Sequence, residues 1–321
     1  MPCGDRLAWL SLATPSQRPE LARVDFNDAD AALPADMPLA HLAGDLTGER
    51  WLTDDTPRDV TIAGWQVRAT THLAMASRFF AEDADESVAD IAYRAYHDLA
   101  TIQNQTGLAY PQRIWHVLSD VVGGNGEAQR YRRFCRGRAE ALAAFETTAA
   151  AAWQSLPPAT LVGGARPGLW IQALLGDTPV IPIENPRQTS AWAYPRRYSE
   201  NAPAFARAGI ITAGHTRFLM ISGTAAIVGH ESCHPGDVLA QFDEALCNVR
   251  AVMAAAAPEI GAHELDDLVC LKLYVRHPED AQRLLGHARR RLPEMPMAAL
   301  AATVCRSELL VELEAHLRVA D

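Results

Sequence analysis

Residues 237–253 have the sequence DVLAQFDEALCNVRAVM, which predicts an amphipathic helix. Large apolar side chains recur in it at spacings of three and four residues, so they share one helical face. These side chains are Leu239, Phe242, Leu246, Val249 and Met253. Asp237 stands where a carboxylate can cap the first turn. A helix with one apolar face has to pack on another element, so this segment decides the fold class of its surroundings.

Strand patterns lie on both sides of this helix in the sequence. A strand is predicted at residues 217–221 and another at residues 268–275. A second helix is predicted at residues 278–291, followed by a closing pair of strands at residues 297–304 and 309–313. This βαβαββ order predicts an α+β fold in which helices pack on one side of a mixed β-sheet.

The preceding part of the chain shows a similar alternation of strand and helix patterns. Strands are predicted at residues 58–68, 70–80, 111–118, 160–162 and 169–175, and helices at residues 85–104 and 127–153. Pro157 and Pro158 indicate a boundary between two halves. We therefore expect an irregular N-terminal segment with short strands at residues 1–57, an N-terminal half at 58–156 and a C-terminal half at 157–321.

Composition excludes several classes of protein. Hydrophobic residues make up 49% of the 321 residues, enough for a sizeable core, and the formal net charge of -10 argues against nucleic-acid binding. No apolar run is long enough to span a bilayer, and the N-terminus lacks the pattern of a secretory leader. The six cysteines form no C-x-x-C pair, which is typical of free thiols in a reducing compartment. We expect a cytoplasmic monomer or small homo-oligomer without a membrane or nucleic-acid partner.

A basic and aromatic loop, ENPRQTSAWAYPRRY, occupies residues 184–198. Its two prolines favour extended geometry, and its three arginines offer planar forks of donors that suit a carboxylate. The loop therefore predicts an anion-binding site. The alternative is a surface loop whose arginines are merely solvated.

This loop resembles the signature of the chorismatase family, and three further blocks in the same order resemble that family as well. The blocks are SGTAAIVGH at 222–230, CRSELLVELE at 305–314, and, more weakly, Arg113-Ile114-Trp115 followed by RYRRFCRGR at 130–138. The resemblance covers Arg113 to Glu314 and does not extend to the first sixty or so residues. It implies two fused RidA/YjgF-like units, most of the active site in the C-terminal half, chorismate as the small anionic substrate, and no cofactor or metal.

Glu312 is the catalytic acid that the resemblance implies. Strand alternation places Glu308, Glu312 and Glu314 on one face, which on its own is more typical of a solvated sheet edge. Nearby carboxylates or apolar surroundings would raise the pKa of Glu312 into the range of a general acid.

The resemblance also implies the residues that bind substrate and select the product. Expected substrate ligands are Arg113, Arg133, Tyr194, Arg196, Tyr198, Gly223, Thr224 and Arg306. The rest of the arginine cluster at 130–138 is equally well explained as a solvated helix face. Small or altered residues that could determine the product are Ala225, Ala301 and His116, the last because His116-Val117 replaces an Asn-Tyr pair of the family.

Residues 230–234, His-Glu-Ser-Cys-His, match the H-E-x-x-H zinc motif. Pro235 and Gly236 follow directly and disfavour the helix that the motif needs, so we expect the match to be accidental.

The leading interpretation is therefore a chorismatase that forms pyruvate and 3- or 4-hydroxybenzoate. The alternatives are hydrolysis to a dihydroxycyclohexadiene carboxylate, a RidA-like protein that binds a carboxylate without turnover, and a zinc hydrolase.

Overall fold

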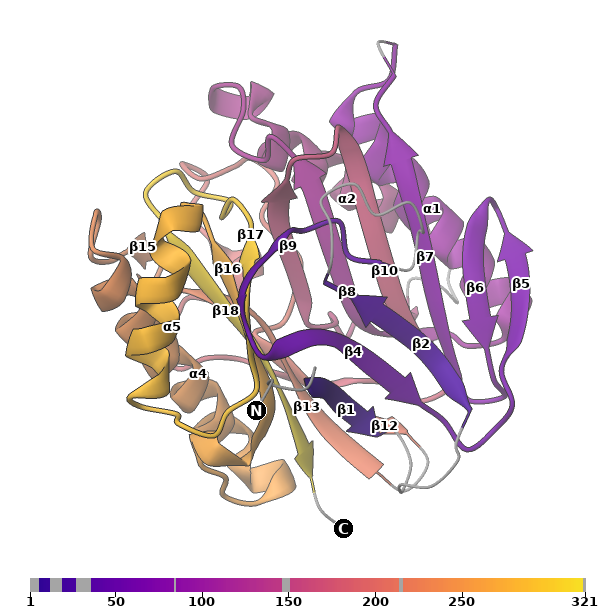
Figure 1. Ribbon diagram of the computed structural model, residues 1–321. Coiled ribbons are helices and arrows are strands. Elements are labelled where there is room, and N and C mark those ends of the chain that lie inside the picture. The colour runs from indigo at the N-terminus through magenta and orange to yellow at the C-terminus, as the bar shows by residue number, and fades with distance from the viewer. Residues whose placement is uncertain are drawn as a thin grey trace.

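The computed structural model describes residues 6–11, 19–26, 36–83, 85–145, 151–213 and 216–319. The fold is α+β, with two large mixed sheets whose helices lie on the outside of the molecule (Figure 1). Within the described residues, no helix is both long and apolar enough to cross a membrane.

The first large sheet has the strand order β5-β6-β7-β10-β8-β9. Its strands are β5 (Arg58–Ile62), β6 (Trp65–Ala69), β7 (Leu73–Ala81), β8 (Tyr110–Ser119), β9 (Ala159–Gly164) and β10 (Gly168–Gly176). Helices α1 (Val88–Thr106) and α2 (Arg130–Ala143) cover one face and share an apolar core with it. Ser87 and Asp90 form a capping box that starts α1, and Gly107 ends the helix with a φ of 75°.

The second large sheet has the order β11-β12-β13-β18-β16-β17-β3. Its strands are β3 (His41–Gly44), β11 (Ile181–Ile183), β12 (Ala208–Ala213), β13 (Thr216–Ala225), β16 (Leu268–Val275), β17 (Met297–Ala301) and β18 (Val311–Val319). Helices α4 (Val238–Ile260) and α5 (Ala281–Arg289) cover its outer face. The Asp237 side chain accepts hydrogen bonds from the backbone N–H groups of Leu239 and Ala240, which confirms the predicted cap.

The two sheets share one topology. In each, the chain forms two antiparallel strands, a helix, a third strand, a second helix and a fourth strand that pairs parallel to the third. A fifth strand then enters the centre of the sheet, where it pairs antiparallel with the second and third strands. The order β6-β7-β10-β8-β9 therefore corresponds to β12-β13-β18-β16-β17. This correspondence is the duplication that the sequence alone could not display.

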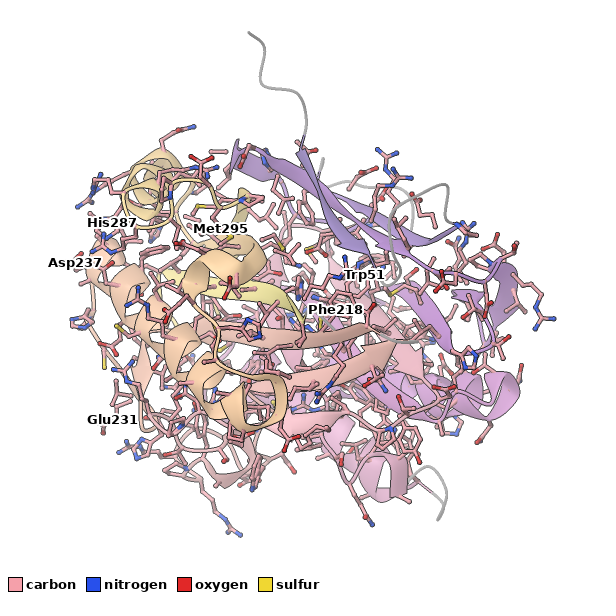
Figure 2. All side chains as sticks on the ribbon, turned by 90° about the horizontal axis from the view of Figure 1, so that it is seen from below. Trp51, Phe218, Glu231, Asp237, His287 and Met295 are labelled. Atoms are coloured by element: carbon pink, nitrogen blue, oxygen red, sulfur yellow. The ribbon has the colours of Figure 1, made fainter. Side chains whose placement is uncertain are left out.

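The N-terminal segment is more ordered than we expected from its sequence. Strands β1 (Arg6–Ser11), β2 (Glu20–Asp25) and β4 (Leu46–Leu52) form a small sheet of order β1-β4-β2, while β3 extends the second large sheet. Trp51 on β4 is fully buried between the sheets, where it packs edge-on against Trp115 and His316. Figure 2 shows Trp51 and Phe218 in this interior, which the inner faces of the sheets fill.

Three further features differ from the predictions. Helix α2 ends at Ala143 rather than near Trp153, although residues 146–150 lie outside the described part. Strands β17 and β18 do not pair with each other, because β16 lies between them. Finally, β9 and β10 belong to the first sheet, so the sheets change after Gly176 rather than at Pro157.

Candidate active site

A cavity of about 240 Å³ opens beside β13 and β18. The N-terminal part of α2, the loop at 194–207 and the turn at 305–309 complete its walls. Three arginines and three tyrosines line it, namely Arg132, Arg207, Arg306, Tyr131, Tyr194 and Tyr198. Two carboxylates line it, the exposed Glu308 and the buried Glu312, and Glu312 also lines a smaller cavity of about 50 Å³.

Glu312 lies on β18 between Ala225 of β13 and Tyr274 of β16. Its exposed fraction is 6% and that of Glu314 is 0%, which excludes the solvated sheet edge. Burial raises the pKa of Glu312 to about 8, and the negative charge of Glu314 adds to the effect, while Arg113 and Arg207 oppose it. Glu312 is therefore protonated at neutral pH, which is the state that a general acid requires.

Gly223 on β13 packs directly against the Glu312 carboxyl group. A Cβ atom at this position would overlap with Oε1 of Glu312, so a side chain here would displace the acid. The neighbouring Thr224 points away from the cavity, and its hydroxyl donates to the Ser222 carbonyl oxygen at 2.7 Å. Of the two substrate ligands predicted in this block, Gly223 lines the cavity and Thr224 does not.

A buried ionic network lies beneath Glu312 and contains Glu314. The Glu314 carboxylate is 2.5 Å from Nζ of Lys272 and 2.8 Å from Nη2 of Arg113. It also accepts hydrogen bonds from Trp115 Nε1, Thr160 Oγ1 and Tyr274 Oη. Despite burial, these charges and donors hold the pKa of Glu314 far below its ordinary range. The predicted clamp Arg113 is therefore committed to Glu314 and does not line either cavity.

The same network reaches the N-terminal sheet through Glu49, whose carboxylate lies 2.9 Å from Lys272 Nζ. Glu49, Cys270 and His316 are the one group of potential metal ligands among the described residues. Since the Lys272 ammonium already lies against Glu49, this cluster is charge-balanced by protein groups.

Arg207 and Arg306 are the cations best placed to receive a substrate. Arg207 is 5% exposed, and its Nη2 donates to the Thr189 carbonyl at 2.7 Å and to Tyr194 Oη at 2.8 Å. Its Nε has no hydrogen-bond partner. Arg306 lies over the Tyr198 ring at 4.2 Å and is fixed by the His230 carbonyl, leaving part of its guanidinium toward the cavity.

Several predicted ligands lie elsewhere. Arg196 is exposed and does not line the cavity, because this part of the loop turns Tyr194 and Tyr198 toward the cavity and leaves Arg196 and Arg197 in solvent. Arg133 is also outside the lining, whereas its neighbour Arg132 is part of it. Ala301 ends β17, where its N–H bonds to the Ala40 carbonyl, away from both cavities. Ala225 does line the larger cavity.

His116 lines the smaller cavity with both ring nitrogens occupied. Nδ1 is 2.9 Å from the Thr160 carbonyl and must donate to it, so Nε2 accepts from Tyr96 Oη at 3.1 Å. Burial lowers the pKa of His116 to about 3, which keeps the ring neutral. His116 therefore shapes the wall as a neutral ring and does not change its charge near pH 7.

The H-E-x-x-H match does not form a helix. Residues Glu231–Ser232 form the short strand β15, which pairs with β14 (Ile227–Val228). His234 has a φ of 55° and lies 3.3 Å from Glu244, while His230 Nδ1 lies near Tyr198 and Arg197. The geometry that the zinc motif requires is thus lacking at these residues.

Sequence reasoning missed Arg207, Arg132, Arg138, Tyr131 and Cys305. Arg138 could have been found, because it shares the apolar face of α2 with Phe134, Cys135 and Ala141. Nothing in the sequence distinguishes Arg207 from a solvated arginine. Cys305 is a half-buried wall residue whose pKa is raised to about 12 by desolvation and by Glu312, so it remains a neutral thiol.

Comparison with solved structures identifies the fold. A chorismatase crystal structure superposes with a TM-score of 0.77 at 24% identity, over 95% of both chains. RidA from a Psychrobacter species matches 42% of this chain and 96% of its own, at a TM-score of 0.30. The fold is that of the chorismatase structure, with two units of one topology and helices on one side of each large sheet.

Sequence comparisons identify the family. Residues 49–175 match the family described as "Chorismatase FkbO/Hyg5-like, N-terminal". A 3-hydroxybenzoate synthase of Streptomyces hygroscopicus is 36% identical over 68% of this chain and 67% of its own. A chorismatase of Streptomyces rapamycinicus is 37% identical over 64% of each chain. The chain belongs to the chorismatase family, whose activity is the conversion of chorismate.

Proposed function

We propose that this enzyme cleaves the enolpyruvyl ether of chorismate and releases pyruvate and a hydroxybenzoate, 3- or 4-hydroxybenzoate. The observation that carries the proposal is the buried Glu312, with a pKa of about 8, in the wall of a cavity lined by arginines. The name of the 3-hydroxybenzoate synthase relative supports the aromatic product.

In the proposed reaction, Glu312 donates its proton to the methylene carbon of the enolpyruvyl group. The ether carbon then becomes an oxocarbenium ion, and the Glu312 carboxylate that remains stabilises it electrostatically. Cleavage of the ether bond to the ring releases the three-carbon unit as pyruvate and leaves a cationic ring, which becomes aromatic by losing a ring proton to the Glu312 carboxylate. In the hydroxybenzoate branch, chorismate yields pyruvate and hydroxybenzoate without net consumption of water.

Arg207, Arg306 and Arg132 would hold the anionic substrate, and the tyrosines would supply further donors. These steps require a proton donor and fixed cations, so we infer that turnover is independent of a metal and survives treatment with a chelator. The described cysteines are free thiols, which supports our inference of a cytoplasmic enzyme.

Hydrolysis is the second candidate. Ala225 on the cavity wall leaves room for a water molecule beside Glu312. Capture of the oxocarbenium ion by water would then give pyruvate and a dihydroxycyclohexadiene carboxylate, with one water consumed.

Incubation of the metal-free protein with chorismate, with pyruvate followed and ring products separated, tests both branches. Hydroxybenzoate supports the proposal, and a non-aromatic diol selects hydrolysis. Chorismate bound without pyruvate release would instead indicate a RidA-like binding protein.

A further inference from the structure

Glu49 brings a buried carboxylate from the N-terminal sheet into the interior that the large sheets enclose. It lies on β4, is 2% exposed, and shares one face of that strand with Trp51, two residues further on. Figure 2 shows Trp51 in this interior. The Glu49 carboxylate enters the same space and lies 2.9 Å from Nζ of Lys272 on β16.

Lys272 is shared between two carboxylates. Its Nζ lies 2.9 Å from Glu49 and 2.5 Å from Glu314, and all three side chains are at most 2% exposed. His316 lies near both carboxylates, with Nε2 3.3 Å from Glu49 and 3.5 Å from Glu314, but burial lowers the pKa of this histidine and favours the neutral ring. Cys270 beside Glu49 is a neutral thiol, because burial raises its pKa well above the ordinary value. Within the described part of the chain, the Lys272 ammonium is therefore the cation that Glu49 balances.

The charges of this network balance when Glu312 is protonated. Two carboxylates, Glu49 and Glu314, face two cations, Lys272 and Arg113. An ionised Glu312 would add a third carboxylate to a desolvated site, where an unbalanced charge is costly. Glu49 offsets part of the Lys272 charge and so leaves more of the Glu314 charge to act on Glu312. Without Glu49 the cations would be in excess, and ionisation of Glu312 would restore the balance.

The other ionisable groups that face Glu312 supply no second buried anion. The smaller cavity and the neighbouring strand place His116, Tyr131, Arg138, Tyr274 and Cys305 around it. The larger cavity adds Tyr194, Tyr198, Arg132, Arg306 and the exposed Glu308. Arg113 and Arg207 favour the ionised form of the acid, and Glu314 opposes them. Among the described groups, Glu314 and, behind it, Glu49 are therefore the buried anions that keep the acid in its neutral form.

We propose that Glu49 is a positioning residue of the N-terminal sheet, which keeps the Glu312 carboxyl group protonated by balancing the charge of Lys272. The inference rests on the proposed function only in that protonated Glu312 is the acid of the reaction. Glu49→Gln should remove the balance, because Lys272 remains charged against Glu314. Glu312 should then ionise about one pH unit lower than in the wild type, and the fall of turnover with rising pH should move by the same amount.

Two measurements give the ionisation midpoint of Glu312. Infrared titration of its carboxyl band, assigned by the loss of that band in Glu312→Gln, needs no substrate, and the pH–rate profile of pyruvate release reports the midpoint during turnover. Glu49→Asp retains the charge and should stay within about 0.3 pH units of the wild type. The double variant Glu49→Gln/Lys272→Met removes one charge of each sign and should return to the same range. Glu20→Gln makes the same change at a partly exposed ion pair of the small N-terminal sheet, and as the matched control it should leave the midpoint in place.

The charge of Lys272 can be followed directly. It is the only lysine of the chain, so labelling with ¹⁵N-lysine gives a single side-chain ammonium signal. This signal should persist in Glu49→Gln at neutral pH. Its replacement by the signal of a neutral amine would mean that the lysine, and not the acid, responds to the loss of Glu49, and the proposal would be overturned.

An unshifted midpoint in folded Glu49→Gln would also overturn the proposal. So would a double variant displaced as far as the single one, which is the result that a merely structural role of Glu49 predicts. If Glu49→Gln does not fold, the same change is made in Lys272→Met, where it should lower the midpoint to the wild-type value, and an unchanged midpoint there counts against the role of Glu49. A protein whose Glu312 titrates as expected but releases no pyruvate from chorismate would refute the proposed function and leave the role of Glu49 standing.

Discussion

Strands β10 and β18 occupy the same central place in the two sheets, yet their inner faces differ in chemistry. On β10 the inner face carries Trp170, Gln172 and Leu174, whereas on β18 it carries Glu312, Glu314 and His316. The outer faces of both strands are apolar and pack under helices. One architecture thus supports an inert core in one half and a buried acid in the other.

The difference shows that the shared topology buries the residues of the central strand but does not decide their charge. A central strand is shielded on both sides by neighbouring strands and, in this molecule, by a second sheet across the interior. Any carboxylate placed there is desolvated, so its pKa is set by the charges nearby. Glu314 has Lys272 and Arg113 within 2.8 Å and stays ionised, whereas Glu312 has no such pair and stays protonated.

The largest expected effect comes from removing the acid. Glu312→Gln should lower the turnover of chorismate by about 10³-fold, because the amide is nearly isosteric but cannot donate the proton. Chorismate binding should persist, since the arginines are unchanged. Steady-state assays of pyruvate release measure the first quantity and calorimetry the second. Glu140→Gln, on the exposed surface of α2, is the control, and near-normal turnover by Glu312→Gln would refute the assignment of the acid.

The fold could be predicted from the sequence where its signals are local. The period of the apolar residues at 239–253 and the cap at Asp237 specify α4 without reference to the rest of the chain. The insertion of β18 between β13 and β16 could not be predicted, because strand alternation states which face is buried but not which strand is the neighbour. For the same reason, no pattern in these residues indicates that β9 and β10 complete the first sheet.

The candidate site could also be predicted only in part. Glu312, Tyr194, Tyr198, Gly223 and Arg306 line the cavity as the family resemblance implied. Of the four predicted arginines, Arg306 lines the cavity and Arg113, Arg133 and Arg196 do not, because the direction of a guanidinium depends on tertiary contacts. Arg207 is held by the Thr189 carbonyl and Tyr194, residues from the far end of a long loop, and no pattern in the sequence reports those bonds.

The second-largest effect is expected from a substitution of Glu314, the carboxylate next to Glu312 on β18. Glu314→Gln leaves Lys272 and Arg113 without their shared anion and should lower the free energy of unfolding by about 3 kcal/mol or more. The loss of a negative charge beside Glu312 should also lower the pKa of Glu312. In the wild type, turnover should fall as pH rises through about 8, and in Glu314→Gln this fall should begin at lower pH. Denaturant unfolding and pH–rate profiles measure the two effects, and an unshifted profile would contradict the coupling.

A smaller effect concerns stability against pH. Between about pH 5 and 8, folded Glu312 keeps a proton that the unfolded chain has released, so the native state loses stability as the pH rises. Relative to Glu312→Gln, the wild type should therefore lose up to about 1.4 kcal/mol of unfolding free energy per pH unit across this window. Parallel denaturant titrations of the two proteins give this difference. A constant difference across the window would show that Glu312 is ionised in the folded protein.

The smallest effect is expected from a substitution on β10, which tests whether the inner face of this strand takes no part in the chemistry. Gln172 is the polar residue on the inner face of this strand and is 2% exposed. Gln172→Leu removes its hydrogen bonding but keeps its approximate volume, so we expect a loss of about 1 kcal/mol in the free energy of unfolding. Turnover of chorismate should stay within about twofold of the wild type, because Gln172 lines neither cavity beside Glu312. A large loss of turnover in a stably folded variant would mean that the inner face of β10 contributes to the chemistry after all, and the functional division between the two central strands would have to be abandoned.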